Sequence, residues 1–275
     1  MNNSEHTNKF IQEAKRRGYG ENTIKNYVSN LNCFFSWSKK DHPKNINESD
    51  IKEYLGRFDQ PNTQRSHHGA IKLFYEICLN QKEKFKWIPY AKKSNKLPIV
   101  LSVSEVQSMF TACQNRKHKA ILSLLYCCGL RVSELINLKW EHLDRSRGII
   151  NILQAKGKKD RQVPFPEQLQ KVLEDYWREY KTKPYVFAGQ FGEQYSARSV
   201  GEVVKQLATK AGIDKRVYTH LMRHNSFTHM AEYGTDINLI QRIAGHSNVK
   251  TTGVYLHLSH NRISSLQTPL SQINL

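Results

Sequence analysis

The sequence lacks any apolar run that approaches the length of a membrane span, and its start, Met1 to Phe10, is polar where a secretory signal would be apolar. We therefore expect a protein that stays in the cytoplasm and has no membrane partner. Cysteine is also scarce: the five cysteines are an odd number and show no paired spacing of metal ligands. We interpret them as reduced core residues, which argues against disulfide bonds and a cysteine metal site.

Acidic residues are few beside the basic ones. Aspartate and glutamate number 24 against 42 lysines and arginines, which gives a formal net charge of +18. A charge so unbalanced repels itself in the compact state unless a partner neutralises it. Because apolar residues still make up 39% of the chain, we expect a folded protein with a polyanionic partner. Nucleic acid is favoured over an anionic membrane surface.

Internal repeats and low-complexity tracts are absent, so the organisation follows from local patterns. Apolar residues at helical spacing, clearest from Thr23 to Trp37, predict a compact helical unit over residues 1–81. The lysine-rich stretch that follows lacks periodicity and contains Pro89, which predicts a basic linker over residues 82–97. A second unit is expected over residues 98–258, followed by a tail of residues 259–275.

The second unit reads as mainly helical with one interruption. An apolar helix from Ala120 to Cys128 is stopped by Gly129. Between Gly148 and Pro164 the pattern changes, and two short apolar runs flank a turn-like stretch that contains Lys156, Lys158 and Lys159. This predicts a β-hairpin with a basic tip. The expected fold class is therefore mainly α with a small β-hairpin or sheet in the second unit.

Arg131 follows Gly129-Leu130 where one predicted helix stops and the next begins. Helix N-termini present unpaired N–H groups and the positive end of the helix dipole, so a guanidinium beside them suits a phosphate oxygen. Taken alone, an arginine in this position is more simply explained as a surface or ion-paired residue.

His220, Arg223 and His224 stand at i, i+3 and i+4, so that His220 shares a helical face with the other two. The zinc helix of metalloproteases needs glutamate directly after its first histidine, and Leu221 stands there instead, so no metal site is predicted. Imidazoles and a guanidinium suit a transition state whose charge spreads over phosphate oxygens. A solvated basic face fits this motif alone equally well.

Tyr255 lies nine residues after His246, which belongs to the triplet Gly245-His246-Ser247. A phenol with an ordinary pKa of about 10 is a poor nucleophile unless neighbouring cations lower it. The motifs above supply such cations, so Tyr255 is a candidate nucleophile.

Taken in order, these motifs resemble the tyrosine recombinases. They are Gly129-Leu130-Arg131-Val132-Ser133-Glu134, a lysine in a β-hairpin, His220-x-x-Arg223-His224, Gly245-His246-Ser247 and Tyr255. The resemblance implies a two-domain, C-shaped DNA clamp, with a helical, SAM-like core-binding domain over residues 1–81 and the catalytic domain over residues 98–258. For the tail of residues 259–275 it suggests docking in a neighbouring protomer, and folding back onto its own core is the alternative. One departure is Ser226, where the family usually has phenylalanine; Phe227 follows, which leaves the packing behind Arg223 open.

The resemblance also implies residue roles. Arg131 and Arg223 would clamp the scissile phosphate, and Tyr255 would attack it to form a 3′-phosphotyrosyl bond. Lys156 would protonate the leaving 5′-oxygen, while His220 and His246 would supply hydrogen bonds and proton transfer. Glu134 would support Arg131. Because the phosphotyrosine conserves the bond energy, the family needs neither a metal ion nor another cofactor.

Double-stranded DNA is the implied substrate, with a dimer on each site and a tetramer on two duplexes, assisted in some systems by accessory directionality proteins. The outcome would be integration, inversion or resolution. Basic residues that suit phosphate contacts are Arg65, His68, Lys72, Lys158 and Lys159. Two alternatives remain open: a nicking-closing topoisomerase, and a catalytically silent, sequence-specific DNA-binding protein.

Overall fold

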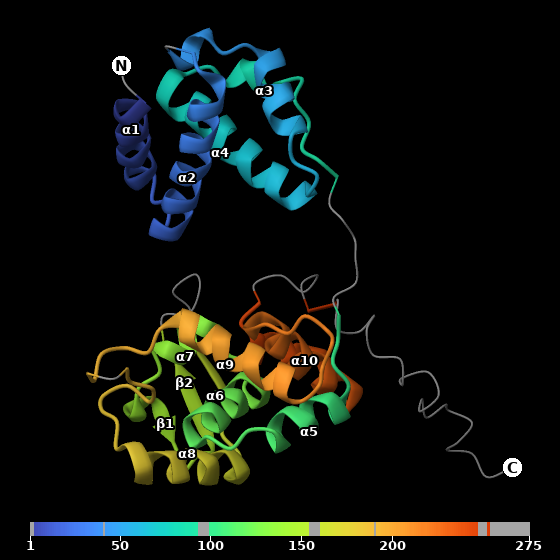
Figure 1. Cartoon of the computed structure of the whole chain (residues 1–275). Coiled ribbons are helices and arrows are strands. Elements are labelled where there is room, and N and C mark those ends of the chain that lie inside the picture. The colour runs from blue at the N-terminus through green and yellow to red at the C-terminus, as the bar shows by residue number, and fades with distance from the viewer. Residues whose placement is uncertain are drawn as a thin grey trace, which may run out of the picture. The chain divides into compact units, whose positions relative to one another are not determined.

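The computed structural model describes residues 3–40, 42–92, 99–153, 160–189, 191–246 and 252–253. The chain divides into two compact units, Met1–Leu97 and Pro98–Leu275 (Figure 1). Each unit has its own hydrophobic core. Within the described residues, no helix combines the length and the apolar character that crossing a membrane requires.

The first unit is helical, as predicted. It contains α1 (Asn3–Arg16), α2 (Glu21–Ser38), α3 (Glu48–Gly56) and α4 (Pro61–Leu79), with the short 3-10 helices η1 (Pro43–Asn45) and η2 (Lys82–Phe85). The apolar periodicity between Thr23 and Trp37 becomes α2, whose residues Leu31 and Phe34 are fully buried. Because α2 packs against both α1 and α4, its apolar stripe forms the centre of this core.

The predicted linker differs from the structure in its first part. Residues Lys82–Phe85 form η2, and the side chains of Phe85 and Ile88 are buried in the core of the first unit. These two apolar residues anchor a segment whose many lysines and Pro89 suggested an extended connection. Residues 93–98 lie outside the described part of the chain.

The second unit is mainly helical around a small sheet. Its helices are α5 (Val103–Thr111), α6 (Arg116–Cys127), α7 (Val132–Ile136), α8 (Glu167–Tyr180), α9 (Ala197–Lys210), α10 (Thr219–Glu232), α11 (Ile237–Ala244) and the 3-10 helix η3 (Trp140–His142). The strands are β1 (Leu143–Asp144), β2 (Ile149–Ile152) and β3 (Arg161–Pro164), antiparallel in the order β1-β2-β3. The predicted hairpin is confirmed, with Ile150 opposite Val163 and Ile152 opposite Arg161.

Helix α6 runs through the middle of this unit and contacts α7, α8, α9 and α10 (Figure 1). Its apolar residues from Ala120 to Leu125 are buried, as is Ser123 among them, which explains why this stretch of the sequence is almost entirely apolar. The chain leaves α6 at Gly129, which has a φ of 57°. This left-handed conformation suits glycine and directs the chain at once into Arg131 and α7.

The five cysteines form no disulfide. Cys78, Cys113 and Cys128 are buried, as the core interpretation predicted, and Cys127 is half-buried. Cys33 is exposed, so the interpretation is wrong for this residue, which lies on the outer face of α2.

Candidate active site

Arg131 lies directly before α7, at the helix N-terminus that the sequence predicted. Its backbone N–H donates to Oε2 of Glu134 over 2.7 Å, and its Nη1 donates to Oε1 over 2.8 Å. The side chain of Arg131 is 23% exposed. Glu134 therefore fixes the arginine at both ends while the guanidinium keeps a solvent-facing edge.

Glu134 is held by a second arginine from a different element. Arg161, at the start of β3, donates from Nη1 to Oε1 and from Nη2 to Oε2, both over 2.7 Å. Burial would raise the pKa of Glu134, but the hydrogen bonds and charge of Arg161, followed by the bonds from Arg131, lower it to about 2. The carboxylate is thus ionised at neutral pH and accepts four hydrogen bonds.

Arg223 is buried in α10, with 1% of its surface exposed. Its guanidinium donates to the backbone oxygens of Gly129 and Ala244, which places it between the end of α6 and the end of α11. The ring of Phe227 lies beneath it, with 4.8 Å between the guanidinium carbon and the ring centroid. Phe227 therefore packs behind Arg223, while the buried hydroxyl of Ser226 has no hydrogen-bond partner among the described residues.

Histidines surround Arg223. The rings of His220 and His224 meet edge to face with centroids 4.6 Å apart. His246 Nε2 lies 3.4 Å from Nη2 of Arg223, and His246 Nδ1 lies 3.0 Å from Oγ1 of Thr252. In the described part of the chain, no group of three or more His, Cys, Asp or Glu side chains is arranged to hold a metal ion.

The environment keeps these imidazoles neutral. Burial, then the charges of Arg223 and Arg131, lower the pKa of His220, and the same causes lower that of His246 to about 4. The pKa of His224 is also lowered to about 4, by burial and by its neighbours His220 and Arg223. A neutral imidazole donates a hydrogen bond through one ring nitrogen and can accept a proton at the other, which suits proton transfer beside a bound anion.

Four of the predicted residues, Tyr255, Lys156, Lys158 and Lys159, lie outside the described residues. Thr252, three positions before Tyr255, is described and fully buried. Its hydrogen bond to His246 links position 252 to the group of histidines around Arg223.

Sequence reasoning missed Arg161. Its side chain points to the buried face of β3, together with Val163, while Gln162 between them is exposed. A charged residue that alternates with an inward-facing apolar residue such as Val163 is costly to bury unless it is paired, and this was the signal available in the sequence.

In the first unit, the predicted DNA contacts divide into two kinds. His68 is 2% exposed, and burial, followed by the charges of Lys72 and Arg65, lowers its pKa to about 4. This corrects the prediction, because a buried neutral ring cannot serve as a cationic phosphate contact. Arg65 and Lys72 are partly exposed and lie 5.1 Å and 5.8 Å from the centroid of the Tyr90 ring, against which His68 packs edge-on.

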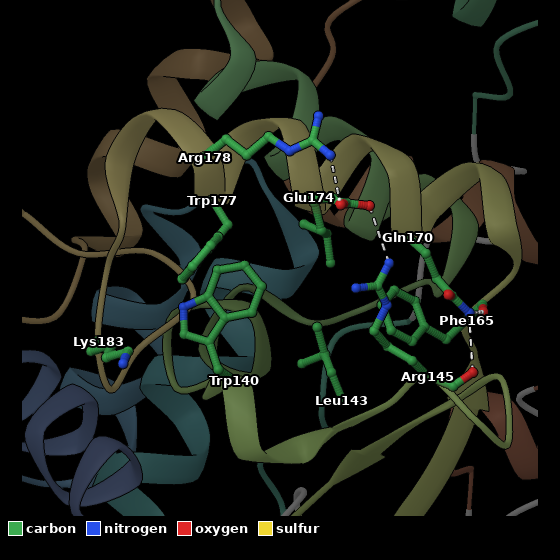
Figure 2. Close-up of a pocket in the computed structure, with 10 residues that line it drawn as sticks. Trp140, Leu143, Arg145, Phe165, Gln170, Glu174, Trp177, Arg178 and Lys183 are labelled. Carbon is green, nitrogen blue, oxygen red and sulfur yellow. Dashed lines mark hydrogen bonds and ion pairs between the residues drawn. The ribbon is translucent and has the colours of Figure 1, made fainter.

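A pocket of about 360 Å³ opens elsewhere in the second unit, between η3, β1 and α8 (Figure 2). Trp140 and Trp177 form part of its lining, and Glu174 at its rim is paired with Arg145 and Arg178. None of the predicted site residues lines this pocket, so we do not assign it to the candidate site.

Two family models match the chain. The model of the phage integrase family matches residues 100–262, and that of the phage integrase N-terminal SAM-like domain matches residues 7–84. Among curated proteins, the tyrosine recombinase XerD of Oceanobacillus iheyensis is 31% identical over 91% of this chain and 92% of its own length. A tyrosine recombinase of Pseudothermotoga lettingae is 30% identical over 88% and 89%.

Solved structures agree on the fold. The crystal structure of XerA recombinase is 30% identical, with a TM-score of 0.55, and the match covers 98% of both chains. A structure of XerH bound to a difH substrate matches with a TM-score of 0.76 and 20% identity, over 94% of this chain and 83% of that one. The chain therefore belongs to the phage integrase family: it is a tyrosine recombinase, an enzyme of site-specific DNA recombination.

Proposed function

We propose that this chain cuts and rejoins double-stranded DNA through Tyr255, with Arg131 and Arg223 as the phosphate clamp. The observation that carries the proposal is the convergence of both guanidiniums on one group of imidazoles. Arg131 comes from the start of α7 and Arg223 from α10, and the charges of both lower the pKa of His220 and of His246. Distant parts of the sequence thus supply one cationic site for an anion.

The reaction follows from these groups. The phenolic oxygen of Tyr255 attacks the phosphorus, its proton passes to a neutral imidazole, and the bond to the 5′-oxygen breaks. Lys156 gives a proton to that oxygen, which leaves a 3′-phosphotyrosyl bond and a free 5′-hydroxyl. Arg131 and Arg223 neutralise the charge that grows on the non-bridging oxygens. A 5′-hydroxyl from a second strand then reverses the step.

DNA binding is supported by the net charge of +18 and by solved neighbours that are complexes with DNA, including a lambda integrase tetramer on a Holliday junction (14% identity, TM-score 0.80). We infer a dimer on each site and a tetramer on two duplexes, acting in the cytoplasm, with residues 259–275 docking on a neighbouring protomer. Arg65 and Lys72 of the first unit, and Lys158 and Lys159, would contact phosphates.

A silent DNA-binding protein is less well supported. A phosphate-binding surface alone does not need an arginine as deeply buried as Arg223, nor a carboxylate held by two arginines, because both are costly to desolvate. A nicking-closing topoisomerase shares the chemistry, but it would not require paired cleavage positions within one site.

The test is a covalent adduct. The purified full chain is incubated, with EDTA present, on duplex DNA from its own genomic neighbourhood, and protease-sensitive protein–DNA adducts are separated on a denaturing gel. Wild type and the exposed-tyrosine control Tyr233→Phe should form the adduct, whereas Tyr255→Phe should not. Well-bound sites that yield no adduct would favour the silent binding protein, and a cut at a single, unpaired position would favour the topoisomerase.

A further inference from the structure

Arg161 is buried beneath the candidate site without being part of the predicted clamp. It is 9% exposed and opens β3, the strand that leaves the hairpin whose tip contains Lys156. Across the sheet it stands opposite Ile152, the last residue of β2. The backbone of Arg161 is therefore fixed at the end of the two-stranded ladder where the connecting segment of the hairpin begins.

The guanidinium of Arg161 joins two elements that each hold a site residue. Two of its nitrogens form the fork on Glu134, which in turn holds Arg131 at its backbone N–H and at its Nη1. Planar fork geometry restricts rotation of both partners, which a single lysine contact cannot do. The position of Arg131 thus depends on Arg161 through one shared carboxylate.

The third nitrogen reaches the other side of the site. Nε of Arg161 donates over 2.7 Å to the backbone oxygen of Ile243, in the last turn of α11. The next residues are Ala244, whose oxygen accepts from Arg223, and Gly245, which precedes His246. Two arginines therefore donate to the last two carbonyls of α11, at the helix C-terminus, where cations are favoured.

The fit between Arg161 and this turn is close. Gly245 has a φ of 63°, and a Cβ placed on it would lie 2.9 Å from Cδ of Arg161. The turn that presents His246 is thus shaped around the Arg161 side chain. Since three of its nitrogens bind protein groups and the side chain is buried, Arg161 is not available as a phosphate ligand.

We propose that Arg161 is the positioning residue of this site: it sets Arg131, through Glu134, and the Gly245-His246 turn, through Ile243, in one fixed relation. The inference rests on the proposed function, because Arg131 and His246 are assigned to the chemistry there. Removing a group that orients catalytic residues typically lowers activity by about 10–100-fold, even though the group itself touches no substrate.

The experiment uses the full chain and a nicked duplex of the mapped site, which traps the adduct in a single turnover. The variants are Arg161→Gln and Arg161→Lys, with Arg178→Gln as the control, an exposed arginine that is ion-paired outside the site. We expect Arg161→Gln to lower the rate of adduct formation about 100-fold and Arg161→Lys about 10-fold. DNA affinity should change by less than about 3-fold, since no phosphate contact is lost.

A second substrate separates positioning from folding. A methylphosphonate at the cut position carries no negative charge, so it depends less on the charge of a correctly placed Arg131. On this substrate, Arg161→Gln should lower the rate of adduct formation by less than about 10-fold. Arg131→Lys, in which the guanidinium itself is replaced, serves as the reference and should show the same smaller loss of rate. An equal loss on both substrates, or an unchanged rate on ordinary DNA, overturns the assignment.

Failure of the variant to fold would not end the test. If Arg161→Gln is unfolded by circular dichroism, the same two-substrate comparison is made with Arg161→Lys and with the double variant Arg161→Gln, Glu134→Gln, which removes both charges together. A wild-type protein that forms no adduct contradicts the proposed function instead. An active wild type with fully active Arg161 variants contradicts only this inference.

Discussion

Gly129 packs directly against the ring of Phe227: a Cβ on Gly129 would lie 2.4 Å from Cζ of that ring. The guanidinium of Arg223 packs on the same ring. This guanidinium also donates a hydrogen bond to the backbone oxygen of Gly129. The glycine, the phenylalanine and the arginine are therefore one packed unit, and space at position 129 decides whether Arg223 can stay in place.

Gly129→Ala should destabilise the protein by about 2–4 kcal/mol, from the strain of a left-handed alanine and from overpacking against Phe227. Urea unfolding measures this change. The control is Gly201→Ala in the middle of α9, where a Cβ meets nothing within 4 Å and a gain of about 0.5–1 kcal/mol is expected. Equal effects at the two positions would contradict the packing argument.

Glu134→Gln should cost about 3–5 kcal/mol, because it leaves buried Arg161 without its countercharge. Glu174→Gln is the matched control, since Glu174 also pairs with two arginines, Arg145 and Arg178, but on the surface. Exposed ion pairs contribute little to stability, so its unfolding free energy should stay near that of wild type. Thermal and urea unfolding of the two variants measure this difference, and equal losses of stability would contradict the prediction.

Stability should fall as the pH is lowered from about 6.5 toward about 4. The pKa of His224 and of His246 is about 4 in the folded chain, whereas the unfolded chain has ordinary histidines with a pKa of about 6.5. In this window the unfolded state binds protons that the folded state does not, so the free energy of unfolding decreases.

Urea unfolding between about pH 7 and about pH 5 measures this slope. His246→Gln should make the slope shallower by up to one proton, or about 1.4 kcal/mol per pH unit. A slope that His246→Gln leaves unchanged would mean that the ring is not protected from protonation in the folded protein.

Arg65→Ala and Lys72→Ala should each make DNA binding less dependent on salt, because each would remove one of the phosphate contacts that we propose for these residues. The slope of log K against log salt should become shallower by about 0.9 per contact. His68→Gln should leave the slope unchanged, since the ring is buried and neutral. A shallower slope for the His68 variant would show that the ring does reach DNA.

Much of the architecture could be predicted because it depends on local signals. The periodicity of α2, the glycine stop after α6 and the break in pattern at the hairpin each lie within one stretch of sequence. The order and spacing of the motifs around Arg131, Arg223 and His246 identified the family for the same reason.

The errors concern burial, which depends on partners far away in the chain. His68 is a histidine on a helix, and only the packing of Phe85 and Tyr90 against it shows that it faces inward. Arg161 becomes intelligible only once residues 27 positions before it and 82 positions after it are in contact. No local pattern could supply either relationship.

Because Arg161 and Arg223 both bind the final carbonyls of α11, fraying of that last turn removes partners from two buried guanidiniums at once. The N–H groups of Gly245 and His246 donate to Arg242 and Gln241 within the same turn. The rate at which these two amides exchange hydrogen therefore reports how often the turn opens and the two arginines lose their hydrogen bonds to it. A change in that exchange rate on binding DNA would show that DNA alters the opening of this turn, even in a variant that cannot cut.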